Sequence, residues 1–196
     1  MPLNNIGNII RFGNMMQASN ALVEEVFLQT RTTGSVTISY SSKTPDGITF
    51  INLLQLNVHR NTVILNSLGR TMCLCDIHKG MWVDAIFSPI TTRSIPPQSN
   101  AFLLLVRSGS RPSSTTSTGR IVSVDTENRS ITTGIPGDIN RQTVFIITDN
   151  TIIRNRTGSP VRLSNLRPGQ TVRIVHSNAQ TASIPPQTTA FYVQVI

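Results

Sequence analysis

The chain has 196 residues, of which 38% are hydrophobic and 13% are charged, and its formal net charge is +8. These values fit one large or two small globular domains and exclude an acidic disordered chain. The polar residues are mostly hydroxyls, with 24 Thr and 20 Ser against 15 Arg and 2 Lys. A basic balance suggests nucleic acid as a partner, but these charges are spread along the chain, and scattered solvated arginines are the simpler interpretation.

Residues 1–33 are predicted to form an apolar N-terminal arm. The arm carries too much apolar surface for a free tail, so we expect it to dock on something. Its second half fits a short helix and a strand equally well. We expect the arm to mediate assembly by adding a strand to a neighbour's sheet edge. The arm residues expected to make this contact are Ile6, Ile9, Ile10, Phe12, Val23, Val26 and Phe27.

The chain shows no targeting or membrane signal. Its first thirty residues lack a basic start followed by a long apolar run, so we expect no Sec-type signal peptide. The longest apolar stretch, Ala101 to Val106, is far shorter than the about 20 residues needed to span a bilayer. The sequence therefore predicts no membrane span.

An internal repeat is the strongest signal in the sequence. The segment from Gly80 to Val106 matches Gly169 to Val195 with 12 identities in 27 positions, at an offset of 89. Further upstream, Gly34-Ser-Val matches Gly119-Arg-Ile at an offset of 85. We therefore predict two repeats, at residues 34–106 and 119–196, joined by a Ser/Thr-rich linker over residues 107–118.

The periodicity within each repeat is that of strands. Val36 to Tyr40 and Gln170 to Val175 alternate between apolar and polar residues, whereas Thr143 to Thr148 is a short apolar run. A repeated Ser-Ile-Pro-Pro-Gln segment leads into the last strand of each repeat, and we interpret it as a stiff entry rather than a polyproline ligand. The sequence predicts an all-β protein with two tandem duplicated small β-barrel or sandwich domains after the arm.

The second repeat carries a recognisable pattern of turns and core positions. Gly119 to Asp125, Thr151-Ile-Ile, Gly158 and Leu163 to Ile174 together resemble the OB-like small-barrel domains of uncharacterised bacterial proteins. The first repeat follows this pattern less closely, because it departs from it between Leu53 and Arg60. The resemblance implies a fold and transfers no functional residue.

Cys73 and Cys75 form the most chemically suggestive stretch. If this segment is a strand, two side chains at i and i+2 face the same side and could share a metal or a partner thiol. The aligned residues of the second repeat are Arg162 and Ser164, which indicates an exposed position. A zinc site needs more ligands than this pair offers, so we predict no metal site. The alternatives are inert thiols and a disulfide between subunits.

Nucleic-acid or glycan binding is a further possibility, and it would use basic residues together with an aromatic side chain. The densest basic cluster is Arg154, Arg156 and Arg162, and Trp82 is the aromatic residue that could be exposed. Aromatic residues make up only 5% of the chain, which weakens this hypothesis.

Nothing in the sequence indicates catalysis. The three histidines, His59, His78 and His176, do not share a spacing with a nucleophile and an orienting carboxylate. His176 aligns with Phe87, which indicates a packing position. We therefore expect no enzymatic activity and no cofactor.

The arm and the twin β-domains favour self-assembly, because a segment that adds to a neighbour's sheet without closing on itself generates a filament. The preferred function is a non-enzymatic subunit of a surface filament, appendage or coat, with itself as partner. The composition is similar to that of spore-surface proteins, which favours a cell or spore surface. The alternative is a tandem OB-like binding module for nucleic acid or glycan, which would be cytoplasmic.

Overall fold

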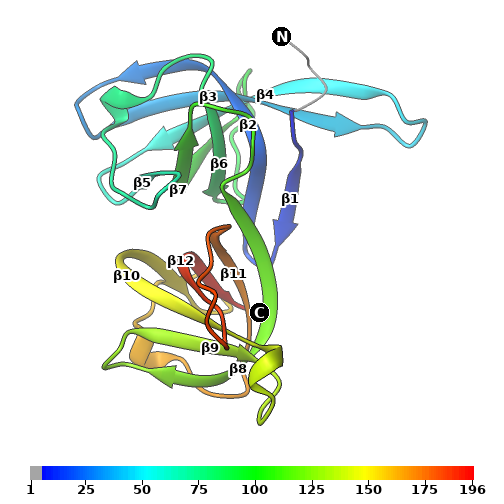
Figure 1. The fold of residues 1–196 in the computed structure, drawn as a ribbon. Helices are drawn as coiled ribbons and strands as arrows, with labels where there is room; N and C mark the ends of the chain where they lie inside the picture. The colour runs from blue at the N-terminus through cyan, green and yellow to red at the C-terminus, as the bar shows by residue number, and fades with distance from the viewer. Residues whose placement is uncertain (1–5) are drawn as a thin grey trace. The chain divides into compact units, whose positions relative to one another are not determined.

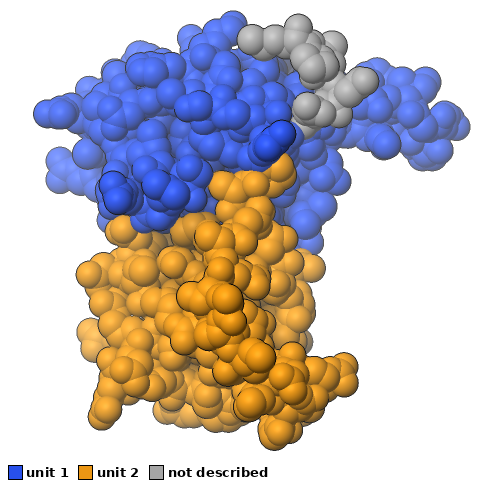
Figure 2. All heavy atoms as spheres, viewed as in Figure 1, with its two compact units in different colours: residues 1–111 blue, residues 112–196 orange. Residues whose placement is uncertain are grey.

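The computed structural model describes residues 6–196 and divides the chain into two compact units, Met1–Arg111 and Pro112–Ile196 (Figure 2). The described residues form strands and short 3-10 turns without an α-helix, which confirms the predicted all-β class. No described helix is long and apolar enough to cross a membrane.

The first unit is built from seven strands (Figure 1). Strand β2 pairs with β3, β3 with β4, β4 with β7, β7 with β6, and β6 returns to β2, so the pairing closes into a ring. The short β1 extends this sheet from β2, and β5 continues the parallel contact of β4 with β7. The elements are β1 (Ile9–Phe12), β2 (Met15–Leu28), β3 (Gly34–Lys43), β4 (Thr49–Val58), β5 (Val63–Asn66), the 3-10 turn η2 (Leu74–Asp76), β6 (Trp82–Phe87) and β7 (Gln98–Arg107).

The second unit is a closed barrel of five strands in the order β10-β12-β11-β8-β9. Its long strand β10 pairs with β12 in parallel, first through Val144–Ile147 and then, after an irregularity, through Ile152–Arg154. The elements are β8 (Ser114–Asp125), β9 (Ser130–Gly134), the 3-10 turn η3 (Ile139–Arg141), β10 (Gln142–Arg154), the 3-10 turn η4 (Leu163–Asn165), β11 (Thr171–Ser177) and β12 (Gln187–Val195).

Both units have the strand order of an OB-fold, a five-stranded Greek-key barrel. The five barrel strands of the first unit are β2, β3, β4 together with β5, β6 and β7, and those of the second are β8 to β12. In each set the first strand pairs with the second and the fourth, and the third pairs in parallel with the fifth. Each unit encloses its own apolar core, because alternate strand residues point into the barrel.

Equivalent elements of the two units lie 89 residues apart from β5 onward, and they repeat the same local bonds. The hydroxyl of Thr62 donates to the carbonyl oxygen of Ala101 over 2.9 Å, and that of Thr151 donates to Ala190 over 2.7 Å. The repeated Ser-Ile-Pro-Pro-Gln segment leads directly into β7 and β12. In both units its serine hydroxyl donates to the carbonyl oxygen of the first proline, Pro96 or Pro185, over 2.8 Å. The segment is thus part of the barrel architecture.

The predicted separate arm at residues 1–33 is wrong. Strand β2 lies inside that range and is the first strand of the barrel, held between β3 and β6. Among the residues expected to dock on a neighbour, Ile6, Phe12 and Val23 are buried in their own unit, and Ile9 and Val26 pack against its core. Ile10 and Phe27 remain exposed. The apolar surface of this segment is therefore largely used within the unit.

The predicted repeat start at Gly34 is also wrong, because Gly119 does not correspond to it. Gly119 lies in β8 opposite Val172, and the residue in the same place of the first unit is Ala21, opposite Val83. The predicted linker is shorter than residues 107–118, since β7 ends at Arg107 and β8 begins at Ser114.

Candidate functional site

The charges of the second unit are unevenly distributed along its sequence. Its four acidic residues all lie between Asp125 and Asp149, whereas residues 151–196 contain five arginines and no acidic residue. The five are Arg154, Arg156, Arg162, Arg167 and Arg173. Residues 151–196 therefore supply the net positive charge of the unit, because the other three arginines of the unit are offset by its four acidic residues.

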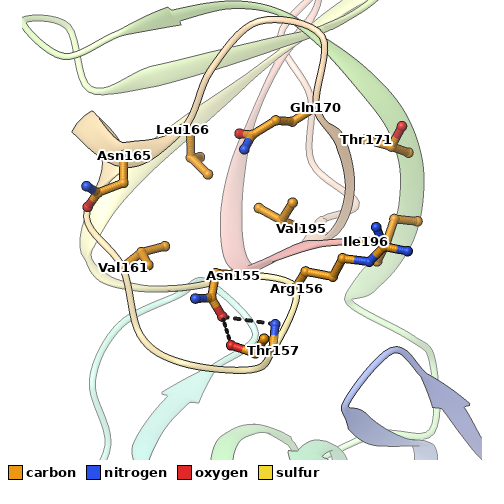
Figure 3. Close-up of a pocket in the computed structure, with 10 residues that line it drawn as sticks. All are labelled: Asn155, Arg156, Thr157, Val161, Asn165, Leu166, Gln170, Thr171, Val195 and Ile196. Carbon is orange, nitrogen blue, oxygen red and sulfur yellow. Dashed lines mark hydrogen bonds between the residues drawn. The ribbon is translucent and has the colours of Figure 1, made fainter.

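A cavity of about 410 Å³ is formed by residues 155–196, and Arg156 is the one of these five arginines that lines it (Figure 3). Its apolar floor consists of Val161, Leu166, Val195 and Ile196, supplied by the segment around η4 and by the end of the chain. Its polar rim consists of Asn155, Arg156, Thr157, Asn165, Gln170 and Thr171. The cavity thus combines an apolar surface with side chains that can form hydrogen bonds.

The three carboxamides of the rim are oriented by their own turns. The Oδ1 atom of Asn155 accepts from the backbone N–H groups of Thr157 and Ser159 over 3.1 and 2.9 Å. The Oδ1 atom of Asn165 accepts from the N–H of Arg162 over 3.0 Å, and the Oε1 atom of Gln170 accepts from the N–H of Arg167 over 2.8 Å. Because these bonds hold the oxygens toward the backbone, the amide NH₂ groups are donors that the rim can offer to a ligand.

The predicted basic cluster is divided by the structure. Arg156 is exposed and lines the cavity, and Arg162 lines an adjoining hollow that shares Val161 and Asn165 with the cavity. Arg154 instead donates from Nη1 to the carbonyl oxygen of Gly158 over 2.6 Å, so its guanidinium is held by its own turn. Two of the three predicted arginines therefore lie where they can reach a ligand.

Trp82 does not join this cluster, because it lies half-buried at the start of β6 in the first unit. Its equivalent in the second unit is Thr171, which lines the cavity. The cavity residues Val161 and Gln170 likewise correspond to Met72 and Met81, which pack against the core of the first unit. The second unit thus has smaller or polar side chains where the first has large ones.

The rim carboxamides were missed at the level of the sequence, because asparagine and glutamine carry no charge and form no motif. The alignment of the two repeats contained the signal, since it places Gln170 opposite Met81 and Thr171 opposite Trp82. A position that is large and apolar in one repeat but polar in the other is not needed for the core of the second barrel, so its polar side chain is a candidate for binding.

Cys73 and Cys75 are joined to each other in a disulfide, which is neither of the two alternatives left open by the sequence, inert thiols and a disulfide between subunits. The strand expected for this segment is also wrong: Cys73 caps the 3-10 turn η2 and Cys75 lies within it. A tight turn, and not an alternating strand, brings the two sulfur atoms together.

His176 occupies a packing position, as its alignment with Phe87 predicts. It is 2% exposed and meets Phe145 edge to face, with ring centroids 5.1 Å apart. Its Nε2 atom lies 2.8 Å from the hydroxyl of Ser117, and its Nδ1 atom lies 2.9 Å from the carbonyl oxygen of Ser177. Burial lowers the pKa of His176. A substrate has no access to an imidazole that is enclosed in this way.

No family model matches the chain, and no curated protein matches it. Among solved structures, it is similar to a deletion mutant of the single-stranded DNA binding protein from Thermus aquaticus, with 9% identity and a TM-score of 0.27 over 93% of this chain and 92% of that one. A TM-score of this size is too low to carry an argument.

Proposed function

We propose that the protein is a non-enzymatic binding module of two OB-fold barrels, and that its second barrel binds single-stranded nucleic acid at the cavity around Arg156. The observation that carries this proposal is the cavity itself. It combines exposed arginine, amide donors and an apolar floor in a part of the chain without acidic residues.

The chemistry of the rim fits an unpaired nucleotide. Arg156 and Arg162 can neutralise phosphates, which releases counterions and supplies binding free energy. The amide NH₂ groups can donate to the carbonyl and ring-nitrogen acceptors of a base, whose faces can rest on Val161 and Leu166. A duplex conceals these base edges by pairing, so the cavity favours a single strand.

A glycan fits the same cavity less well. Sugar hydroxyls need acceptors as well as donors, and each carboxamide oxygen of the rim already accepts at least one backbone N–H, so these side chains offer more donors than acceptors. Among the described residues, no aromatic ring lines the cavity to stack against a sugar or a base. Binding of nucleic acid is therefore expected to depend strongly on charge and hence on salt.

The test is fluorescence anisotropy with a labelled single-stranded oligonucleotide of mixed sequence, at several salt concentrations. The variant Arg156→Ala/Arg162→Ala should bind more weakly, and the slope of log affinity against log salt should become shallower by about 1.4, because each phosphate contact contributes about 0.7. The control Arg60→Ala/Arg141→Ala removes the same charge from two exposed arginines elsewhere and should keep the slope. Equal slopes for both variants would refute the site.

Self-association is a second candidate function, and it is favoured by a different element from the predicted arm. The β3–β4 hairpin extends beyond the barrel, because β4 pairs with β7 only from Gln55 to Asn57 (Figure 1). Ile48, Phe50, Ile51 and Leu53 are 57%, 51%, 42% and 45% exposed along it. The outer edge of β4 over residues 49–54 pairs with no other described strand, so the same segment of a second copy could add to it.

Sedimentation velocity over a range of concentrations tests this second candidate. The intact chain should associate, and the variant Phe50→Ser/Ile51→Thr should remain monomeric with an unchanged circular dichroism spectrum. A chain that stays monomeric at the highest concentration would remove the candidate.

A further inference from the structure

The turn η2 concentrates three metal-ligating side chains in the first unit. The sulfur atoms of Cys73 and Cys75 and a carboxylate oxygen of Asp76 all lie within 4.8 Å of one another. Asp76 is fixed in this arrangement, because its Oδ2 atom accepts from the N–H of Cys73 over 3.0 Å. Both cysteines are half-buried at the surface, and Asp76 is exposed.

The fold does not need sulfur at this turn, since the equivalent turn η4 forms without it. There the sequence is Arg162-Leu163-Ser164-Asn165, and the side chain of Asn165 accepts from the N–H of Arg162 over 3.0 Å just as Asp76 does from Cys73. The backbone bonds also recur: the N–H of Asp76 donates to the carbonyl oxygen of Cys73 over 3.1 Å, and that of Asn165 donates to the carbonyl oxygen of Arg162 over 3.0 Å.

A disulfide between residues two apart also restricts the unfolded chain very little, because the stabilisation grows with the length of the closed loop. The backbone bonds of the turn therefore do not require two cysteines, and the disulfide adds little to the stability of the fold.

We propose that the reduced turn is a binding site for a thiophilic divalent cation such as Zn²⁺ or Cd²⁺, with the sulfur atoms of Cys73 and Cys75 and the carboxylate of Asp76 as ligands. A small thiol reductant opens the disulfide: two molecules of the reductant are oxidised to one disulfide, and the cysteines gain two electrons and two protons. The cation then displaces both protons and binds the two thiolates.

The geometry of the turn suits this change. Thiolates at about 2.3 Å from a tetrahedral Zn²⁺ lie about 3.8 Å apart, which two side chains with Cα atoms 5.0 Å apart reach by rotation alone. The carbonyl oxygen of Arg31 lies 2.9 Å from the sulfur of Cys73, so it can accept from the thiol before the cation binds.

The groups that face the turn favour a cation. A cleft of about 370 Å³ borders Cys75 and is also lined by Glu24, Glu25, His78 and Lys79. Lys79 lies 3.9 Å from Glu24 and offsets the charge of that carboxylate. The negative charge of Glu25 is not offset by this ion pair. The cleft provides room for a fourth ligand, supplied by water or by a neighbouring side chain.

The experiment uses the full chain, reduced with dithiothreitol, desalted without oxygen and titrated with CdCl₂. One Cd²⁺ per chain should bind, with the ultraviolet charge-transfer absorption of cadmium thiolates, and the oxidised chain should show no such absorption. The variant Cys73→Arg/Cys75→Ser copies the η4 sequence, so it should fold and lose the absorption.

The variant Asp76→Asn copies Asn165 of η4 and keeps the cap of the turn. It should keep the thiolate absorption while weakening Cd²⁺ affinity by at least about tenfold, the loss typical even of changes next to metal ligands. The control Asp46→Asn removes an exposed carboxylate at the tip of the β3–β4 hairpin and should bind as the parent does. Absence of Cd²⁺ binding by the reduced chain, equal binding by Cys73→Arg/Cys75→Ser, or an unchanged affinity for Asp76→Asn would each overturn the proposal.

Discussion

Replacement of Asp84 by asparagine should strongly destabilise the first unit. The carboxylate of Asp84 and the guanidinium of Arg107 are 7% and 5% exposed, and Nη1 donates to Oδ2 over 2.8 Å. Asp84 also accepts from the backbone N–H of Asn20 over 2.7 Å, and Arg107 donates to the side-chain oxygen of the same residue. A neutral amide at this position would leave a buried cation without its counter-charge, which costs about 3–5 kcal/mol.

Urea unfolding followed by tryptophan fluorescence measures this cost. Trp82 is the one tryptophan of the chain and lies opposite Arg107 in the β6–β7 pair, so its emission reports the first unit. With a urea slope of about 2 kcal/mol/M, the midpoint should fall by about 2 M. A fall of less than about 0.5 M would refute the reasoning.

The double variant Asp84→Leu/Arg107→Ile separates loss of charge balance from loss of packing. It removes both charges. Isoleucine is chosen for position 107 because the equivalent residue of the second unit is Ile196. Apolar replacement of a whole buried ion pair is often neutral or stabilising. The double variant should therefore be more stable than Asp84→Asn, and a double variant that is less stable would contradict the assigned cause.

Two further predictions concern the second unit. Burial lowers the pKa of His176 below its ordinary 6.5, so the unfolded state takes up a proton first as the pH falls. The contribution of His176 to stability should therefore be complete above pH 6.5 and decline below it, as measured by thermal unfolding followed by circular dichroism. The variant His176→Phe should lose this decline. Gly134 has φ of +133°, and an added Cβ would lie 2.1 Å from the carbonyl oxygen of Arg141. Gly134→Ala should therefore destabilise the unit by about 1–3 kcal/mol in urea unfolding. The control Gly137→Ala should cost less, because its Cβ would meet nothing within 4 Å.

The sequence predicts the all-β class and the equivalence of the last two strands in each unit, because the matches around Ser94 and Ser183 are dense. It fails at the beginning of the repeats, where Gly34 and Gly119 match by chance. The first strand of each barrel pairs with the fourth, some sixty residues away, and this contact leaves no local pattern. Apolar residues of β2 such as Val23 were therefore assigned to an arm that docks on a neighbouring subunit.

The candidate site was predicted in part for a similar reason. Arg156 and Arg162 stood out because charges are visible in a sequence, whereas Asn155 and Gln170 become donors only through the turns that occupy their oxygens. The cysteines show the opposite case, in which a correct residue pair was given the wrong geometry because a period of two was assumed for a 3-10 turn.

The parallel contact that closes each barrel also sets the order in which the chain can fold. It joins Gln55 to Gln98 in the first unit and Val144 to Gln187 in the second, partners 43 residues apart in both cases. Contacts of such long sequence separation slow folding, because the entropy cost of closing the loop comes before the stabilising strand pairing can form. During synthesis on the ribosome, the first barrel can close once β7 has emerged, and the second must wait for β12.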